Sequence, residues 1–193
     1  APFCDLCCLC TFGKCDLTRG KLGACGIDIK TQQARIVLLA CCIGASTHSA
    51  HARHMLENLI RKYGEDYPVN LGTEIEVEAP NIRLVTGVKP KNLGDLTYIL
   101  NYCEEQITHC LAATHTGQEG NYIDFESKAL HVGMIDLVAM EVGDIEQIIT
   151  FGFPKGDPDA PLSQTGLGCI DVTKPVLLCI GHNVSSGIEI IDY

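Results

Sequence analysis

The stretch CDLCCLCTFGKC, residues 4–15, places five cysteines within twelve positions. A sixth, Cys25, follows shortly after, and the other six of the 12 cysteines are scattered between residues 41 and 179. Disulfides that stabilise a fold usually join segments that are far apart in the sequence, so crowding at one end favours a metal site. This cysteine-rich stretch is therefore a candidate metal site.

Four of these cysteines, Cys7, Cys10, Cys15 and Cys25, form the pattern C-x2-C-x4-C-x9-C. Iron–sulfur clusters take four cysteine thiolates at such spacings, and the glycines between these residues allow the backbone to turn toward the sulfurs. Structural zinc, the main alternative, usually binds two separated C-x2–4-C pairs. The pattern favours an iron–sulfur cluster, and a zinc-stabilised interaction domain stays open as the alternative.

Cys4 and Cys8 remain once that set is assigned. Two ligands cannot complete a four-cysteine cluster. They are either core thiols or half of a cluster shared across a two-fold axis, to which each subunit gives the same pair. The residues alone do not choose between these readings.

Composition excludes several classes of protein. The 193 residues are 46% apolar and 20% charged, which is typical of one globular domain or two small ones. The formal net charge of −10 argues against binding to a nucleic-acid backbone or an anionic membrane. No apolar run reaches the roughly 18 residues of a membrane span and no signal peptide is recognisable, so we expect a soluble protein of the cytoplasm.

Helix formers and apolar spacing predict a mainly helical domain. Between the helices, residues 64–92 are expected to form a long connection with a short strand at 82–85. Whether the first two predicted helices are separate or form one helix bent at Gly44 is open. Helices are predicted at 31–42, 46–63, about 94–113 and 124–149.

The apolar run from Lys174 to Gly181 resembles a buried parallel strand. The expected architecture is therefore a cysteine-rich cluster loop over residues 1–30 and a helical domain over residues 31–173. Residues 174–193 would form the first strand and the start of an α/β, Rossmann-like domain.

Histidines supply the other candidate functional groups. His48, His51 and His54 stand at i, i+3 and i+6 of a predicted helix, where neighbours lie about 5–6 Å apart. Such a row can pass protons or bind metal, although an ordinary polar helix face is an equal alternative. His182 follows the predicted strand at its carboxyl end, where open α/β sheets place ligands, and is a candidate metal ligand.

These motifs together resemble those of a known family. CCLCTFGKC (7–15), GACG (23–26) and GASTHSAHARH (44–54) are similar to the N-terminal region of nickel-containing carbon monoxide dehydrogenases. The later stretches resemble the archaeal branch, the alpha subunits of acetyl-CoA decarbonylase/synthase complexes. They are RLVTGVKPKNLGD (83–95), THTGQEG (114–120), FGFPKGDPDAP (151–161) and CIGHN (179–183).

The resemblance implies an enzyme that interconverts CO and water with CO2, two protons and two electrons at a nickel–iron–sulfur centre. [4Fe–4S] clusters would connect that centre to the surface of a homodimer and to a ferredoxin, and other subunits of the complex would be partners. Residue by residue, Cys7, Cys10, Cys15 and Cys25 would hold one relay cluster per chain. The resemblance assigns Cys4 and Cys8 to the cluster shared at the dimer axis. In bacterial members the shared-cluster cysteine directly precedes the first relay ligand, whereas here Cys8 follows Cys7.

The resemblance also assigns the histidines. His48 would act as acid or base beside the active centre, and His51 and His54 would continue a proton path. His182 would be the ligand of the iron outside the nickel-containing cubane. The chain is expected to be an N-terminal fragment that lacks most ligands of the nickel centre, which belongs to the full-length subunit. A stand-alone iron–sulfur electron carrier is the alternative if the chain is complete.

Overall fold

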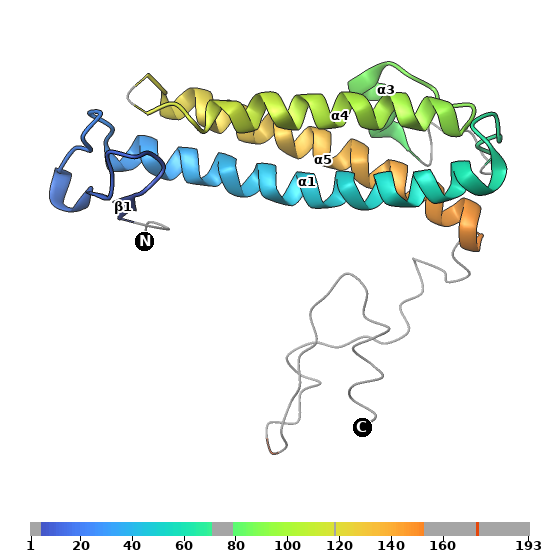
Figure 1. The fold of residues 1–193 in the computed structure, drawn as a ribbon, viewed down its shortest axis with the longest axis horizontal. Coiled ribbons are helices and arrows are strands. Elements are labelled where there is room, and N and C mark those ends of the chain that lie inside the picture. The colour runs from blue at the N-terminus through green and yellow to red at the C-terminus, as the bar shows by residue number, and fades with distance from the viewer. Residues whose placement is uncertain (1–4, 71–78, 118, 153–172, 174–193) are drawn as a thin grey trace. The chain divides into compact units, whose positions relative to one another are not determined.

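The computed structural model describes residues 5–70, 79–117, 119–152 and 173 (Figure 1). The chain separates into two compact units, Ala1–Pro154 and Lys155–Tyr193. The first unit contains all the elements described below. The predicted strand beginning at Lys174 lies outside the described residues.

Helix α1 (Ile29–Tyr63) is a single helix of 35 residues. It begins at Asp28, whose side chain accepts a hydrogen bond of 2.8 Å from the Thr31 backbone N–H. The helix continues through Gly44, which decides between the two predicted alternatives in favour of one helix. Cys42 and Ala45 on either side are buried in the core, and this packing offsets the roughly 1 kcal/mol that a glycine costs inside a helix.

Helices α4 (Leu93–Ala113) and α5 (Tyr122–Phe151) confirm the two later helical predictions. Asn92 and Asn121 cap them, each accepting a hydrogen bond from a backbone N–H of the first turn. Figure 1 shows that α1 and α5 run in the same direction. Helix α4, which lies between them in the sequence, runs in the opposite direction. The two parallel helices begin side by side, since Lys30 Nζ lies 3.5 Å from the Tyr122 ring centroid.

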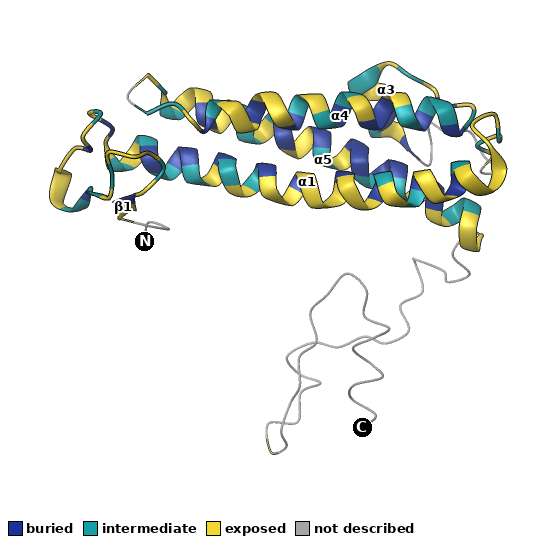
Figure 2. Cartoon of the chain, in the orientation of Figure 1, coloured by how far each residue is buried: buried dark blue, intermediate teal, exposed yellow. Residues whose placement is uncertain are grey.

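The core of this three-helix arrangement is formed by apolar side chains on the facing stripes of the helices. Buried residues follow one side of each helix, while the outward sides are exposed (Figure 2). Fully buried examples from the three helices are Leu38, Leu56, Ile99 and Ile135. Among the described residues, none of the helices combines the length and apolar character that a bilayer crossing requires.

The prediction of a strand at 82–85 is wrong, because this segment belongs to helix α3 (Pro80–Thr86). Pro80 stands in its first turn, where a missing N–H costs nothing, and Gly87 ends it at φ 72°. Glu141 of α5 accepts hydrogen bonds from the backbone N–H groups of Asn81 and Ile82, at 2.9 and 2.7 Å. A carboxylate from another helix thus caps α3, and the sequence of residues 82–85 alone could not indicate this.

The N-terminal segment, predicted as a loop, contains a short hairpin. Strand β1 (Leu6–Cys7) pairs antiparallel with β2 (Cys15–Asp16), and a 3-10 turn at Thr18–Gly20 follows. Figure 1 shows this hairpin at the end of the bundle where α1 begins. The segment has a small core of its own, made of Cys7, Leu17 and Ile27.

Candidate metal centre

The hairpin brings two of the predicted ligands together. Cys7 and Cys15 are direct partners in the β1–β2 register. Side chains of directly opposed residues lie on the same face of an antiparallel pair, with Cβ atoms about 4.5–5.5 Å apart. Cys7 is 5% exposed and Cys15 is half-buried, and both contact the small core of Leu17 and Ile27.

Cys25 joins the same cluster from a separate turn. It packs, half-buried, against the small core, and the turn that carries it is closed by the Gly26 N–H donating to the Gly23 carbonyl at 2.8 Å. The α4–α5 connection reaches this point as well. A Cβ atom on Gly117 would lie 2.8 Å from Cys25 Sγ, so this close approach requires glycine.

Cys8 and Cys10 differ from this set because both are exposed. The loop that follows Cys10 is tight: the Gly13 N–H donates to the Cys10 carbonyl, and a Cβ on Gly13 would stand 2.7 Å from the Cys7 carbonyl oxygen. Adjacent Cys7 and Cys8 therefore have opposite environments, one buried and one at the surface. Cys4 lies outside the described residues.

Two N–H groups are directed at sulfur atoms of the hairpin. The Ala24 backbone N–H donates to Cys15 Sγ at 3.3 Å, and Arg35 Nη2 donates to Cys7 Sγ at 3.0 Å. Arg35 is only 3% exposed. Its Nε and Nη2 also donate to Gln32 Oε1, and its Nη1 donates to the Thr116 carbonyl. A buried guanidinium thus joins α1, the cysteine hairpin and the α4–α5 connection.

Gln32 is the second polar residue buried here, at 1% exposed. Because its Oε1 accepts from Arg35, its Nε2 faces elsewhere, and that Nε2 is buried without a hydrogen-bond partner among the described residues. A buried donor without an acceptor is costly, and it fits a site where an acceptor belongs. Sequence reasoning missed both residues, since polar positions in a helix usually face solvent.

The hydrogen-bond donors around the cysteines suit a metal–sulfur group. Nowhere in the described ranges do three or more His, Cys, Asp or Glu side chains form a group that could hold one metal ion. A [4Fe–4S] cluster takes one thiolate on each of its irons, so its ligands stand farther apart than those around a zinc ion. Sulfur atoms that accept N–H donors, and the buried amide of Gln32, suit such an anionic metal–sulfur group.

The cysteines of the bundle have a different environment. Cys42, Cys103 and Cys110 are buried among apolar side chains, where a free thiol packs as a small hydrophobic residue. Desolvation raises the pKa of Cys42 to about 11 and that of Cys103 to about 12, and it also raises the pKa of Cys110. These thiols are neutral at physiological pH and poor metal ligands.

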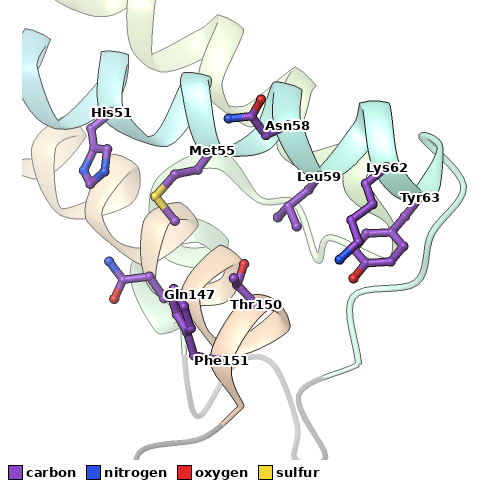
Figure 3. A pocket seen from close by; sticks show the side chains of 9 residues that line it. All are labelled: His51, Met55, Asn58, Leu59, Lys62, Tyr63, Gln147, Thr150 and Phe151. Atoms are coloured by element: carbon purple, nitrogen blue, oxygen red, sulfur yellow. The ribbon is translucent and has the colours of Figure 1, made fainter.

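The three histidines of α1 lie well away from the cysteine hairpin. His48 is 13 positions beyond Arg35, a distance of roughly 20 Å along a helix. His48 Nδ1 lies 2.7 Å from Asp136 Oδ1 of α5. His51 lines an open pocket of about 440 Å³ between α1 and α5, together with Met55, Tyr63 and Phe151 (Figure 3).

His54 is exposed and does not line that pocket. In the part of the chain that the structure describes, no hydrogen bond or ion pair joins His48, His51 and His54 to one another. His182 lies outside the described residues.

The fold and the cysteine end together define a helical bundle with a cysteine-rich hairpin at one end. The chain belongs to the Prismane/CO dehydrogenase family, which it matches over residues 5–76 and 65–193. The family resemblance indicated by the sequence motifs is thereby confirmed.

Relatives narrow the likeness to the archaeal branch. The chain is 68% identical over 192 residues to the acetyl-CoA decarbonylase/synthase complex subunit alpha of Methanocaldococcus jannaschii, covering 100% of this chain and 25% of the relative. The corresponding subunit of Methanothermobacter thermautotrophicus is 58% identical over 193 residues, with the same coverage. The chain thus spans about a quarter of the length of these curated relatives.

A solved structure supports the fold. It is a nickel-free crystal structure of carbon monoxide dehydrogenase from Thermococcus sp. AM4, matched with a TM-score of 0.56 at 18% identity. The match covers 78% of this chain and 31% of that chain. At this identity the likeness concerns the fold alone, and it agrees with the mainly helical architecture.

Proposed function

We propose that this chain is the N-terminal electron-relay part of a carbon monoxide dehydrogenase within an acetyl-CoA decarbonylase/synthase complex. The observation that carries the proposal is the set of N–H donors around the hairpin that pairs Cys7 with Cys15. Donors of this kind, at the end of the bundle where the cysteines gather, stabilise negative charge on sulfur.

In this proposal Cys7, Cys10, Cys15 and Cys25 hold one [4Fe–4S] cluster. The cluster supplies one-electron transfer when it is bound. The protein contributes the geometry: the hairpin register sets Cys7 against Cys15, and Gly117 leaves room beside Cys25. The N–H groups of Ala24 and Arg35 stabilise negative charge on the sulfurs.

Cys8, together with Cys4, is proposed to bind a second cluster that two copies of the chain share. The support is that the adjacent residues Cys7 and Cys8 have different environments, one buried in the small core and one at the surface. Phe12 and Leu22 of the same segment are 84% and 62% exposed, and such apolar side chains suit a surface that a second copy covers.

The histidines are proposed to move protons. His48 is held by Asp136, and this contact fixes the orientation of its ring. His51 and His54 would continue the path along α1, and His182 would bind the iron outside the nickel-containing cubane. The nickel–iron–sulfur centre, the CO and CO2 chemistry, the ferredoxin acceptor, the other subunits of the complex and a cytoplasmic location belong to the same proposal.

The test is an anaerobic analysis of iron, sulfide and zinc in the purified protein, together with its molar mass in solution. About four irons and four sulfides per chain, with a half-share of a further cluster in a dimer, would support the relay and the shared cluster. Zinc without sulfide would overturn both and leave a zinc-stabilised domain. CO oxidation with a dye acceptor then tests the enzyme activity in the full-length subunit.

A further inference from the structure

We propose that Arg35, oriented by Gln32, is the counter-charge of the relay cluster and sets its reduction potential as a positioning residue. The inference rests on the proposed function, because it assigns two further residues to the cluster that Cys7 and its partners hold. Neither residue belongs to the cysteine pattern.

The first step concerns the charge of Arg35. The guanidinium is 3% exposed, and arginine cannot lose its proton in a protein. Buried charges are normally paired with an opposite charge. Yet none of the ion pairs found among the described residues includes Arg35. The proposed cluster ligand Cys7 contacts it directly, with Cys7 Sγ 3.0 Å from Arg35 Nη2.

The second step concerns orientation. Arg35 Nε and Nη2 lie 3.1 and 2.6 Å from Gln32 Oε1, and Nη1 donates to the Thr116 carbonyl. Donors on three nitrogens of one planar group fix the plane of the guanidinium and its position against Cys7. The position of the guanidinium is therefore fixed by contacts with α1 and with the α4–α5 connection.

The third step is independent of the charge. Gln32 Nε2 is buried and has no acceptor in the described part of the molecule. Gln32 lies one turn of helix before Arg35, on the same side of α1. Arg35 contacts both Gln32 and Cys7 of the cysteine hairpin. An inorganic sulfide or a ligating thiolate would satisfy this amide, so both residues present N–H donors to the same anionic group.

These contacts predict a direction for the reduction potential. Reduction adds one electron from an external donor and makes the cluster more negative by one charge. A buried cation and N–H donors to sulfur stabilise that added charge, so they raise the potential. Removing the positive charge should make the cluster harder to reduce.

The experiment is a redox titration of the purified chain, monitored by electron paramagnetic resonance, with dithionite as the reductant. Arg35→Gln should make the reduced-to-oxidised ratio of the relay cluster at least tenfold smaller at a fixed potential, a fall of about 59 mV for a one-electron couple. Arg35→Lys keeps the charge and should restore most of the potential. Arg53→Gln, on the same helix but far from the cysteine hairpin, is the matched control and should leave the potential unchanged.

Iron content and circular dichroism separate the outcomes. An iron-loaded Arg35→Gln variant with the wild-type potential would overturn the inference, as would Arg35→Lys failing to restore it. If Arg35→Gln is folded but free of iron while Arg35→Lys is loaded, the charge requirement is supported. If both variants lose iron and helix content alike, Arg35 is only structural and the inference falls. Absence of iron in the wild-type chain would instead overturn the proposed function.

Discussion

The two ends of the helical bundle bury polar groups of opposite kinds. At the cysteine end, α1 buries Arg35 and Gln32, which present N–H donors. At the other end, where α3 packs on α5, the buried polar residues are the acids Glu141 and Glu146. Glu141 is fully used, accepting from two backbone N–H groups and the Asn81 side chain. Both oxygens of Glu146 lack a partner among the described residues.

The difference shows which buried polar group requires a ligand. A buried carboxyl can take up a proton and become neutral, and desolvation raises the pKa of Glu146 to about 9 even though Arg53 acts in the opposite direction. A guanidinium cannot escape in this way, because it stays charged. The cysteine end therefore needs a negative charge to balance Arg35, whereas a protonated Glu146 needs no counter-ion.

The largest expected effect separates the loop cysteines from those of the bundle. Cys15→Ala should abolish the relay cluster, because Cys15 is the cross-strand partner of Cys7. Cys110→Ala should leave the iron content intact, since Cys110 is a neutral thiol in the apolar core. Iron, sulfide and visible absorption of the anaerobically purified variants provide the measurement. Equal loss of iron in both would contradict the assignment of the ligands.

Much of the bundle could be predicted from the sequence because its signals are local. The apolar spacing of α4 and the caps Asn92 and Asn121 lie within or beside the helices that they define. The sequence around Gly44 left open whether one helix or two form there, because packing against the other helices decides this. The strand expected at 82–85 is wrong because its capping acid, Glu141, comes from far along the chain.

The candidate site divides in the same way. The cysteines could be recognised because their spacing is short and their chemistry is distinctive. Arg35 and Gln32 could not be recognised, because the sequence does not show whether a polar residue of a helix is buried or exposed. The partners of Arg35, Cys7 and Thr116, are 28 and 81 residues away in the sequence. Only the tertiary structure brings these groups together.

The next largest effect is a pH dependence caused by Glu146. Its pKa is about 9 in the folded chain against an ordinary value of 4.5. Between these values the folded chain holds a proton that the unfolded chain releases, so the free energy of unfolding falls as pH rises. Glu146→Gln removes this dependence. The stability of the variant relative to wild type should therefore increase by on the order of 3–4 kcal/mol from pH 5 to pH 8.

Urea denaturation at several pH values between 5 and 8 measures this effect. Glu126→Gln is the matched control, because Glu126 is an exposed acid of the same helix. Its stability should follow the wild-type curve at every pH. A Glu146→Gln curve parallel to wild type would show that Glu146 is ionised in the folded chain and would remove the contrast with Arg35.

A smaller effect is expected at the satisfied acid of the same end. Glu141→Ala leaves the N–H groups of Asn81 and Ile82 without acceptors at the start of α3, at a cost of about 2–3 kcal/mol. Glu126→Ala, exposed on the same helix, should change the free energy of unfolding by less than about 0.5 kcal/mol. Hydrogen exchange adds a local readout, since the amide of Ile82 should lose protection in Glu141→Ala alone. Retained protection would mean that α3 is not held by this cap.

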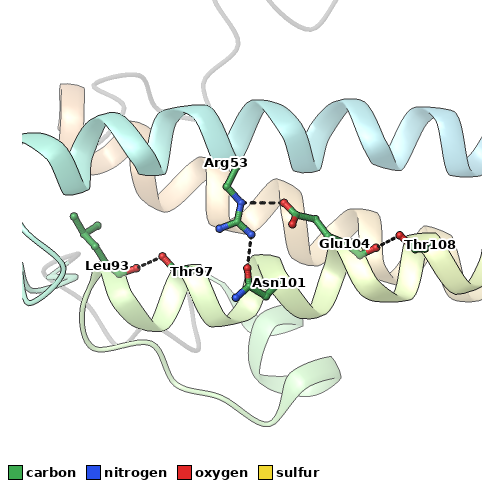
Figure 4. Close-up of polar contacts among 6 residues, drawn as sticks. All are labelled: Arg53, Leu93, Thr97, Asn101, Glu104 and Thr108. Carbon is green, nitrogen blue, oxygen red and sulfur yellow. Dashed lines mark hydrogen bonds and ion pairs between the residues drawn. The ribbon is translucent and has the colours of Figure 1, made fainter.

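The smallest effect concerns Arg53, which lies on the same helix as Arg35. Arg53 Nε donates to Glu104 Oε1 at 2.9 Å and Nη2 donates to Asn101 (Figure 4). The Glu104 side chain is 45% exposed, so solvent screens the pair, and Glu104→Gln should cost less than about 1 kcal/mol. The cost should disappear in about 1 M salt, where the screening length is about 3 Å. A larger cost that persists in salt would mean that Arg53, like Arg35, depends on a buried anion, and the two arginines would no longer differ in kind.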